Sequence, residues 1–260
     1  FRYPGVRSDS DMFTLAYPFA PWQGRQTIAS GGAIVDYLRR TAGEHGVGDL
    51  VRLRHRVTGA DFDTAAARWT LTVETAEGTT TLTCRFVHVC AGYYSYDEPH
   101  DPAIPGLADF AGALVHPQFW PDDLRYEGRR VVVIGSGATA VTLVPALVEE
   151  SENGQAAAHV TMVQRSPTWI GSIPSQDPLD RLARRLLPAG TAHRLIRLRH
   201  VIEGSTLYAL SRRAPAVLRR ILLRRATREL RGDATLVRDH LTPAYDPWDQ
   251  RLCAAPDGDF

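Results

Sequence analysis

Residues 31–46 carry the clearest helical pattern in the first third of the chain. Ile34, Val35 and Leu38 recur on one side, and a glycine at 46 or 48 would end the helix. Residues 1–32 are rich in proline, glycine, serine and aromatic residues and show no sustained period. They therefore predict an irregular segment that covers a binding site.

Alternation typical of strands follows this helix. Residues 50–57 (LVRLRHRV) alternate between apolar and polar side chains, and residues 68–92 predict a β-meander that turns at Glu77 and Gly78. The last part of that meander, residues 86–92 (FVHVCAG), has the pattern of a buried strand with a glycine stop.

A second α/β unit is predicted from residue 129 onward, after a linker rich in proline, aspartate and aromatic residues. The segment RRVVVIGSGATA runs from a short apolar strand into a glycine-rich turn and a helix, and residues 159–167 (HVTMVQRSP) predict the next strand. Residues 178–232 are helical in pattern, with breaks at Pro188 and Pro215. Turns and short strands are expected over residues 233–260.

The glycine-rich turn predicts a dinucleotide site. A strand that ends in a tight turn lets the next helix aim its free N–H groups at a pyrophosphate, and glycines permit both the turn and the close approach. The predicted cofactor-binding residues are Gly135, Ser136, Gly137, Ala138 and Thr139, with Ala140 as the small residue that lets the helix pack on the sheet. A purely structural glycine turn is the alternative.

The end of the next strand indicates which dinucleotide binds. A site for NAD presents an acid to the ribose, whereas this strand ends in Gln164, Arg165 and Ser166. An arginine fork and a hydroxyl can bind a 2′-phosphate, so NADPH is favoured. The alternative is that Arg165 is one more solvated arginine.

Composition restricts the class of protein. The 260 residues are 44% hydrophobic and 23% charged, as in ordinary soluble globular proteins. No apolar run is long enough to span a bilayer and the first residues lack a signal-peptide core, so a cytoplasmic location is expected. Cys84, Cys90 and Cys253 form no CxxC pair, which predicts buried free thiols and no metal site.

The basic residues are unevenly placed. All 30 are arginine, and residues 181–232 hold 14 of them against Glu203 and Glu229. This segment is interpreted as a solvated helical face that covers the active site, or as a peripheral contact with an anionic membrane surface. Nucleic-acid binding is the weakest alternative because the segment has few aromatic residues, and no nucleic-acid partner is expected.

The linker contains a spaced motif. Phe110, Gly112, His116, Trp120 and Pro121 follow the pattern F-x-G-x-x-x-H-x-x-x-W-P just upstream of the glycine loop. This motif resembles the fingerprint of the Baeyer–Villiger monooxygenases, a family of class B flavoprotein monooxygenases. RYPGVRSDSD, IASGGAIVDYLR, VQRSPT and PWDQRL also resemble its segments, in its order, and the ethionamide-activating subgroup is the most similar. The resemblance covers essentially the whole chain.

The resemblance implies a function and site residues. FAD and NADPH would be the cofactors, and one oxygen atom of O2 would be inserted into a ketone, giving an ester or lactone, or transferred to sulfur. Arg251 in PWDQRL corresponds to the family's catalytic arginine, and Asp9 in YPGVRSD to the acid that orients it. Gln250 stands where the family often has a lysine for the 2′-phosphate, which leaves more of that selection to Arg165.

Two alternatives stay open at the level of sequence. One is an N- or S-oxygenating flavin monooxygenase, against which Trp120 and Arg251 count. The other is a non-catalytic NADP-binding fragment, because no FAD glycine loop precedes residue 93. The partners expected for the enzyme are a small ketone or sulfur compound and O2, and the sequence predicts no oligomeric state.

The linker histidine is not predicted as a metal ligand. Pro117 restricts His116 to an extended backbone, and no second ligand stands at metal spacing. We expect His116 to hydrogen-bond across a domain junction, as a hinge contact that couples movement of the NADP domain to the flavin site.

The predicted fold class is α/β with two dinucleotide-binding, Rossmann-like domains. Residues 1–93 would form part of an FAD-binding domain, residues 94–128 the linker, and residues 129–260 an NADP-binding domain with a helical insert at about 175–240. Both ends of the sequence look internal to a longer protein, so the FAD domain is expected to be incomplete.

Overall fold

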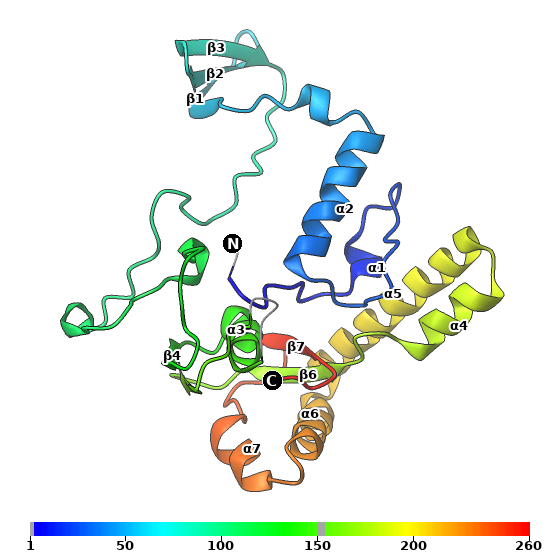
Figure 1. The fold of residues 1–260 in the computed structure, drawn as a ribbon. Helices are drawn as coiled ribbons and strands as arrows, with labels where there is room; N and C mark the ends of the chain where they lie inside the picture. Colours follow the sequence, from blue (N-terminus) through cyan, green and yellow to red (C-terminus); the bar gives the residue numbers. More distant parts are fainter. Residues whose placement is uncertain (1–2, 150–153) are drawn as a thin grey trace. The chain divides into compact units, whose positions relative to one another are not determined.

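The computed structural model describes residues 3–149 and 154–260, which divide into two compact units (Figure 1). Unit 1 lies within Phe1–Tyr37 and Ile104–Phe260, and unit 2 is Leu38–Ala103. This division by packing does not follow the boundaries at residues 93 and 128 that the sequence suggests. The assignment of those ranges to one cofactor each stays a prediction.

Unit 2 is built on an antiparallel sheet. Strands β1 (Arg56–Asp63), β2 (Arg68–Thr75) and β3 (Gly78–Cys84) pair in that order, after the short 3-10 helix η1 (Gly48–Leu50). Phe62 and Trp69 face each other across β1 and β2, with ring centroids 5.2 Å apart. The predicted meander and its turn before Gly78 are confirmed.

Two predicted strands of this region are wrong. Residues 50–55 are not a strand, because Arg54 adopts a positive φ of 57° that turns the chain, and β1 begins only at Arg56. Residues 86–92 also form no strand, and Phe86 and Val89 are 79% and 78% exposed. A buried strand needs pairing neighbours and a covered face, and the described residues supply neither to this segment.

Unit 1 contains the strand, turn and helix that the sequence predicts. Strands β4 (Arg130–Ile134) and β5 (His159–Val163) pair in parallel, and α3 (Ala138–Val148) connects them. Val131 and Val133 point to the face that α3 covers, where they meet Leu143 and Leu147. The alternation of these valines with exposed Val132 therefore reflects one covered face of the strand pair.

A second parallel pair lies in the same unit. Strands β6 (Trp169–Ile173) and β7 (Leu252–Pro256) are far apart in sequence and adjacent in space. The chain between them forms four helices, α4 (Pro178–Leu186), α5 (Ala189–Arg213), α6 (Pro215–Glu229) and α7 (Ala234–His240). The predicted helical region 178–232 and its breaks at Pro188 and Pro215 are confirmed. The expectation of only turns and short strands after residue 232 is wrong for α7, whose first turn is capped by Asp233. Trp169 of β6 packs with Leu218 and Leu222 of α6.

The N-terminal segment is irregular, as predicted, apart from the short helix α1 (Met12–Leu15). Met12, Phe13, Trp22 and Tyr37 form a core that is closed by Ile196 of α5. Helix α2 (Gly31–Glu44) confirms the predicted helix and runs from unit 1 into unit 2. The linker contributes two 3-10 turns, η2 (Leu107–Asp109) and η3 (Pro117–Phe119).

The three cysteines are free thiols in different environments. Cys253 is buried, Cys84 is intermediate and Cys90 is exposed. The prediction of buried thiols is wrong for Cys90, because residues 86–92 do not form the buried strand expected of them. Within the described ranges, no helix combines the length and apolar character needed to cross a lipid bilayer.

Leu147 should be a principal stabilising side chain of unit 1. It is 1% exposed in the core beneath α3, so Leu147→Ala would leave a cavity and lower the free energy of unfolding by about 2–5 kcal/mol. Leu186→Ala, at a position 68% exposed, should change that free energy by less than about 0.5 kcal/mol. Denaturant titration of both variants measures the difference, and equal losses would contradict this account of the core.

Candidate functional site

The glycine loop presents the backbone donors that an anion requires. Gly135 follows β4 with φ 140°, and Gly137 is the N-cap of α3 without any side-chain cap. The first N–H groups of a helix have no partner inside it, so these donors are open to a ligand. A Cβ built on Gly135 or Gly137 would meet no atom within 4 Å, which leaves room for a phosphate to approach.

Ser136 serves the loop itself. Its hydroxyl donates to the carbonyl of Ser166 at 2.7 Å, and its own carbonyl accepts from the hydroxyl of Thr168. Ser136 and Thr168 are 7% and 3% exposed. The side chain of Ser136 is therefore occupied within the protein, and its backbone is the part that could contact a pyrophosphate. The sequence did not indicate Thr168, whose hydroxyl makes the second hydrogen bond that holds this loop.

The two residues predicted for the 2′-phosphate differ in their surroundings. Arg165 is exposed in the turn after β5 and is free to reach a ligand. Ser166 accepts a hydrogen bond from Nη2 of Arg251 at 3.2 Å, although 85 positions separate the two residues. The structure thus brings together the predicted cofactor-selecting turn and the predicted catalytic arginine.

The pairing of strands β6 and β7 explains why Arg251 contacts Ser166. Trp169 pairs with Leu252 in the parallel ladder of β6 and β7, so the residues that precede both strands lie at the same end of the sheet. Nε of Arg251 is buried and has no hydrogen-bond partner among the residues that the structure describes. A buried, unpaired guanidinium N–H is costly unless something binds it, and this donor fits an anionic or carbonyl oxygen.

Asp9 reaches the same strand but not Arg251. Its Oδ1 accepts from the backbone N–H of Ala254 at 2.9 Å, and across residues 3–149 and 154–260 no ion pair within 4.0 Å joins it to Arg251. Asp9 is exposed as a residue, yet its carboxyl loses part of its hydration. Desolvation raises the pKa of Asp9, against the opposing effects of the Ala254 N–H and of Arg7.

Cys253 stands in the sequence between Arg251 and Ala254, the residue to which Asp9 binds. Burial and, to a smaller extent, the Asp9 carboxylate raise the pKa of its thiol, Arg251 opposes them, and the pKa is about 11 as a result. The thiol is therefore neutral and acts as a small buried side chain. Asp9 and Arg251 both act electrostatically on Cys253, so they flank one short stretch of β7.

Further contacts that the sequence did not reveal hold the Asp9 segment in place. Arg7 forms a two-bond ion pair with Asp259, and Thr27 donates its N–H to the carbonyl of Ser175 at 2.9 Å. Gly5 has φ 78°, and a Cβ there would lie 2.4 Å from the carbonyl oxygen of Thr142 in α3. Only glycine permits this close approach, so the YPGVRSD segment is fitted against both α3 and β7.

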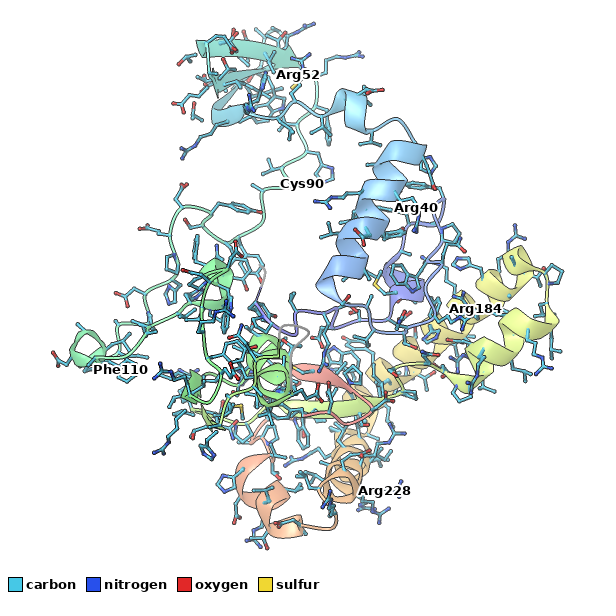
Figure 2. All side chains as sticks on the ribbon, viewed as in Figure 1. Arg40, Arg52, Cys90, Phe110, Arg184 and Arg228 are labelled. Atoms are coloured by element: carbon cyan, nitrogen blue, oxygen red, sulfur yellow. The ribbon has the colours of Figure 1, made fainter. Side chains whose placement is uncertain are left out.

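The linker motif has a local structural basis. A Cβ at Gly112 would lie 2.6 Å from the ring of Phe110, so the ring folds over the glycine. Phe110 is exposed in the linker (Figure 2). Trp120 packs edge-on against Tyr126, 6.2 Å between centroids, and joins the core under α3. Pro121 follows it in an exposed turn.

His116 makes a short-range hydrogen bond. Its Nδ1 accepts from the N–H of Gln118 at 3.2 Å and caps the turn η3, with the extended backbone expected before Pro117. His116 is otherwise exposed. The observed bond lies within the linker, so a hinge contact that crosses a domain junction stays a prediction.

Part of the arginine-rich region is structural. Nη1 of Arg197 donates to the carbonyl of Phe13 at 2.7 Å and also to those of Thr14 and Ala16. These hydrogen bonds satisfy carbonyls at the C-terminal end of α1. Arg184 donates to the carbonyl of Gly24 at 3.0 Å. The interpretation as a solvated helical face is wrong for these arginines, because they hold the irregular N-terminal segment on α4 and α5.

In the same region, Arg199 is held by ion pairs with two aspartates. Asp177 and Asp180 accept from it at 2.9 and 2.8 Å, and Asp180 also contacts Nε2 of His200 at 2.8 Å. Arg199 and the hydrogen bond of Leu179 lower the pKa of Asp177 despite its partial burial. In the described ranges, no group of three or more His, Cys, Asp and Glu side chains is arranged to hold a metal ion.

Comparison with known proteins identifies relatives of the whole chain. It is 48% identical over 260 residues to the FAD-containing monooxygenase EthA of Mycolicibacterium smegmatis, and 46% identical to EthA of Mycobacterium tuberculosis. Each alignment covers 100% of this chain and 52% of the relative. The chain thus spans about half the length of the curated relatives it matches.

A solved structure has the same fold. An oxidized steroid monooxygenase bound to NADP superposes with a TM-score of 0.72 at 23% identity, over 99% of this chain and 55% of that one. The likeness confirms the predicted α/β fold class. Residues 27–182 match the FMO-like family, described as flavin-binding monooxygenase-like. The relationship to flavoprotein monooxygenases that the motifs indicate is confirmed, and the chain belongs to the flavin-binding monooxygenase-like family.

Proposed function

We propose that the complete protein is an FAD-containing, NADPH-dependent monooxygenase that inserts one oxygen atom of O2 into ketones, with sulfur oxygenation as a further outcome of the same chemistry. The names of the relatives support a flavin monooxygenase, and the NADP in the steroid monooxygenase structure supports the second cofactor. The ketone specificity rests on the linker motif and on Arg251.

The observation that carries the proposal is the setting of Arg251. It directly precedes β7, one of its nitrogens is bound to Ser166, and another is buried and has no partner among the described residues. An oxygen-transfer reaction develops negative charge on oxygen, and a guanidinium held in a site that excludes water stabilises such charge without reorganisation. Arg251 is therefore assigned as the catalytic cation.

Asp9 is assigned as a positioning residue. The sequence suggests that it orients Arg251 directly, whereas its observed bond goes to the backbone of Ala254. We propose that Asp9 acts on Arg251 by fixing strand β7, three residues from the arginine. The ion pair of Arg7 with Asp259 supports this role, because it fastens the same segment near the end of β7.

The glycine loop and Arg165 are assigned to NADPH. Backbone N–H groups at Gly137, Ala138 and Thr139 would hold the pyrophosphate at the start of α3, where no side chain caps them. Arg165 would bind the 2′-phosphate from the exposed turn after β5. When bound, NADPH and FAD would supply the hydride and the reactivity toward O2. The chain's own residues bind, orient and balance charge.

Arg251→Ala should separate oxygen transfer from flavin reduction. Removing one preorganised donor should lower ester formation from a ketone by about 10²- to 10³-fold, while NADPH still reduces the flavin. Stopped-flow absorbance and product chromatography measure the two steps. Arg185→Ala, at an exposed arginine of α4, is the matched control and should retain both. Ester formation retained by Arg251→Ala would refute the assigned role.

Arg165→Ala should reduce the preference for NADPH. Loss of a charge-assisted contact with the 2′-phosphate should raise the KM for NADPH by about 10- to 100-fold. The KM for NADH should stay the same, because NADH lacks that phosphate, and it serves as the internal control. Equal changes for both cofactors would show that Arg165 supports the fold of the turn and not the selection.

His116→Ala should uncouple the reaction if His116 is the predicted hinge contact. Hydrogen peroxide released per NADPH oxidised should rise, while flavin content stays unchanged. His116→Asn keeps a side-chain acceptor for the N–H of Gln118 and so isolates the capping role. Recovery of full coupling in the Asn variant, or unchanged coupling in the Ala variant, would contradict the hinge.

A further inference from the structure

Helix α6 and its two ends display arginines that nothing in the described protein neutralises. Six exposed arginines have no acidic group within 4.0 Å among the described residues: Arg213, Arg220, Arg224, Arg225, Arg228 and Arg231. Of these, Arg225 donates to the carbonyl of Ser172 at 3.3 Å. Their neighbours are engaged, since Arg212 pairs with Asp249 and Arg219 with Asp246. The only acid of α6, Glu229, accepts from Ser172.

The spacing of three of these arginines is unfavourable for the helix itself. Arg220, Arg224 and Arg228 follow one another at intervals of four residues, so they lie on one side of α6. Like charges at this spacing destabilise a helix, and no acidic residue stands three or four positions from any of the three to offset the repulsion. A surface that is costly in isolation points to an anionic partner.

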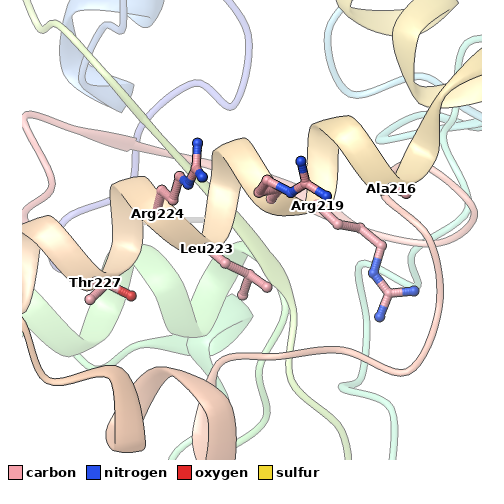
Figure 3. A pocket seen from close by; sticks show the side chains of 6 residues that line it. Ala216, Arg219, Leu223, Arg224 and Thr227 are labelled. Carbon is pink, nitrogen blue, oxygen red and sulfur yellow. The ribbon is translucent and has the colours of Figure 1, made fainter.

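Apolar side chains adjoin this row. Val217 and Ile221 are 47% and 38% exposed, while Leu218 and Leu222 on the other side anchor α6 to Trp169. Arg219, Arg220 and Arg224 also line an open pocket of about 540 Å³ together with Ala216, Leu223 and Thr227 (Figure 3). The helix is thus fixed by its buried face and presents cationic and aliphatic groups side by side.

We propose that this surface, defined by Val217, Arg220, Ile221, Arg224 and Arg228, binds reversibly to an anionic membrane surface. Arginines beside short aliphatic side chains match the headgroup region of a bilayer, where guanidinium groups meet phosphates and apolar groups enter the acyl boundary. Nucleic acid fits less well, because α6 has no aromatic residue on which a base could stack. The inference does not depend on the proposed enzymatic activity.

The test uses the complete protein and sedimentation with lipid vesicles. Vesicles of phosphatidylcholine with about 30% phosphatidylserine should bind it, vesicles of phosphatidylcholine alone should not, and salt should weaken the binding. The variant Arg220→Gln, Arg224→Gln, Arg228→Gln should lower partitioning to the anionic vesicles by about 100-fold, at roughly fivefold per arginine.

A charge-matched variant separates this surface from net charge. Arg52→Gln, Arg68→Gln, Arg85→Gln removes three exposed arginines of unit 2 and should bind as the parent does. The proposal fails if both triple variants lose binding equally, or if the parent protein does not bind anionic vesicles. It also fails if a DNA duplex binds the α6 surface and displaces the vesicles at equal phosphate concentration. Unchanged Tm values must accompany each comparison.

Discussion

The parallel pairing of β6 with β7 is the constraint on which the candidate site depends. It places Arg251 beside Ser166, and Ser166 in turn is bonded to the glycine loop through Ser136. Hydrogen bonds therefore connect the turn proposed to select the cofactor, the loop that would hold the pyrophosphate and the proposed catalytic cation. A shift of β7 by one residue would turn Arg251 to the opposite face of the sheet and break this connection.

The N-terminal segment is the second element of the site, and it has little secondary structure of its own. Three kinds of contact hold it in place instead. Gly5 packs tightly on α3, Asp9 binds β7, and the guanidinium of Arg197 donates hydrogen bonds to carbonyls at the end of α1. Irregular backbone needs such partners because its polar groups are not satisfied by a ladder or a helix. Some arginines of the helical region thus bind the N-terminal segment, whereas others, on α6, are exposed to solvent.

The flavoprotein relationship and the ketone chemistry rest on different grounds. Family membership follows from agreement over most of the chain, while the proposed insertion of oxygen into ketones rests on a few residues in their observed setting. The chain spans about half the length of its curated relatives, so the proposed monooxygenase activity is that of the complete protein. The local contacts of Arg251 and Asp9 nevertheless restrict what each could do there: one offers an unpaired buried donor, and the other secures a strand.

The sequence by itself determined the elements with strong local signals. The strand, glycine turn and helix of residues 130–148, the meander at 68–84 and the proline breaks of the helical region each follow from short-range pattern and turn chemistry. The linker and end motifs indicated the family and singled out Asp9 and Arg251. Tertiary structure alone decided that residues 86–92 are not a strand, because a buried strand requires neighbours that local pattern cannot supply. It also decided that Asp9 binds β7 and that Arg251 meets Ser166, since contacts across 245 and 85 positions depend on strand pairing and not on local propensity.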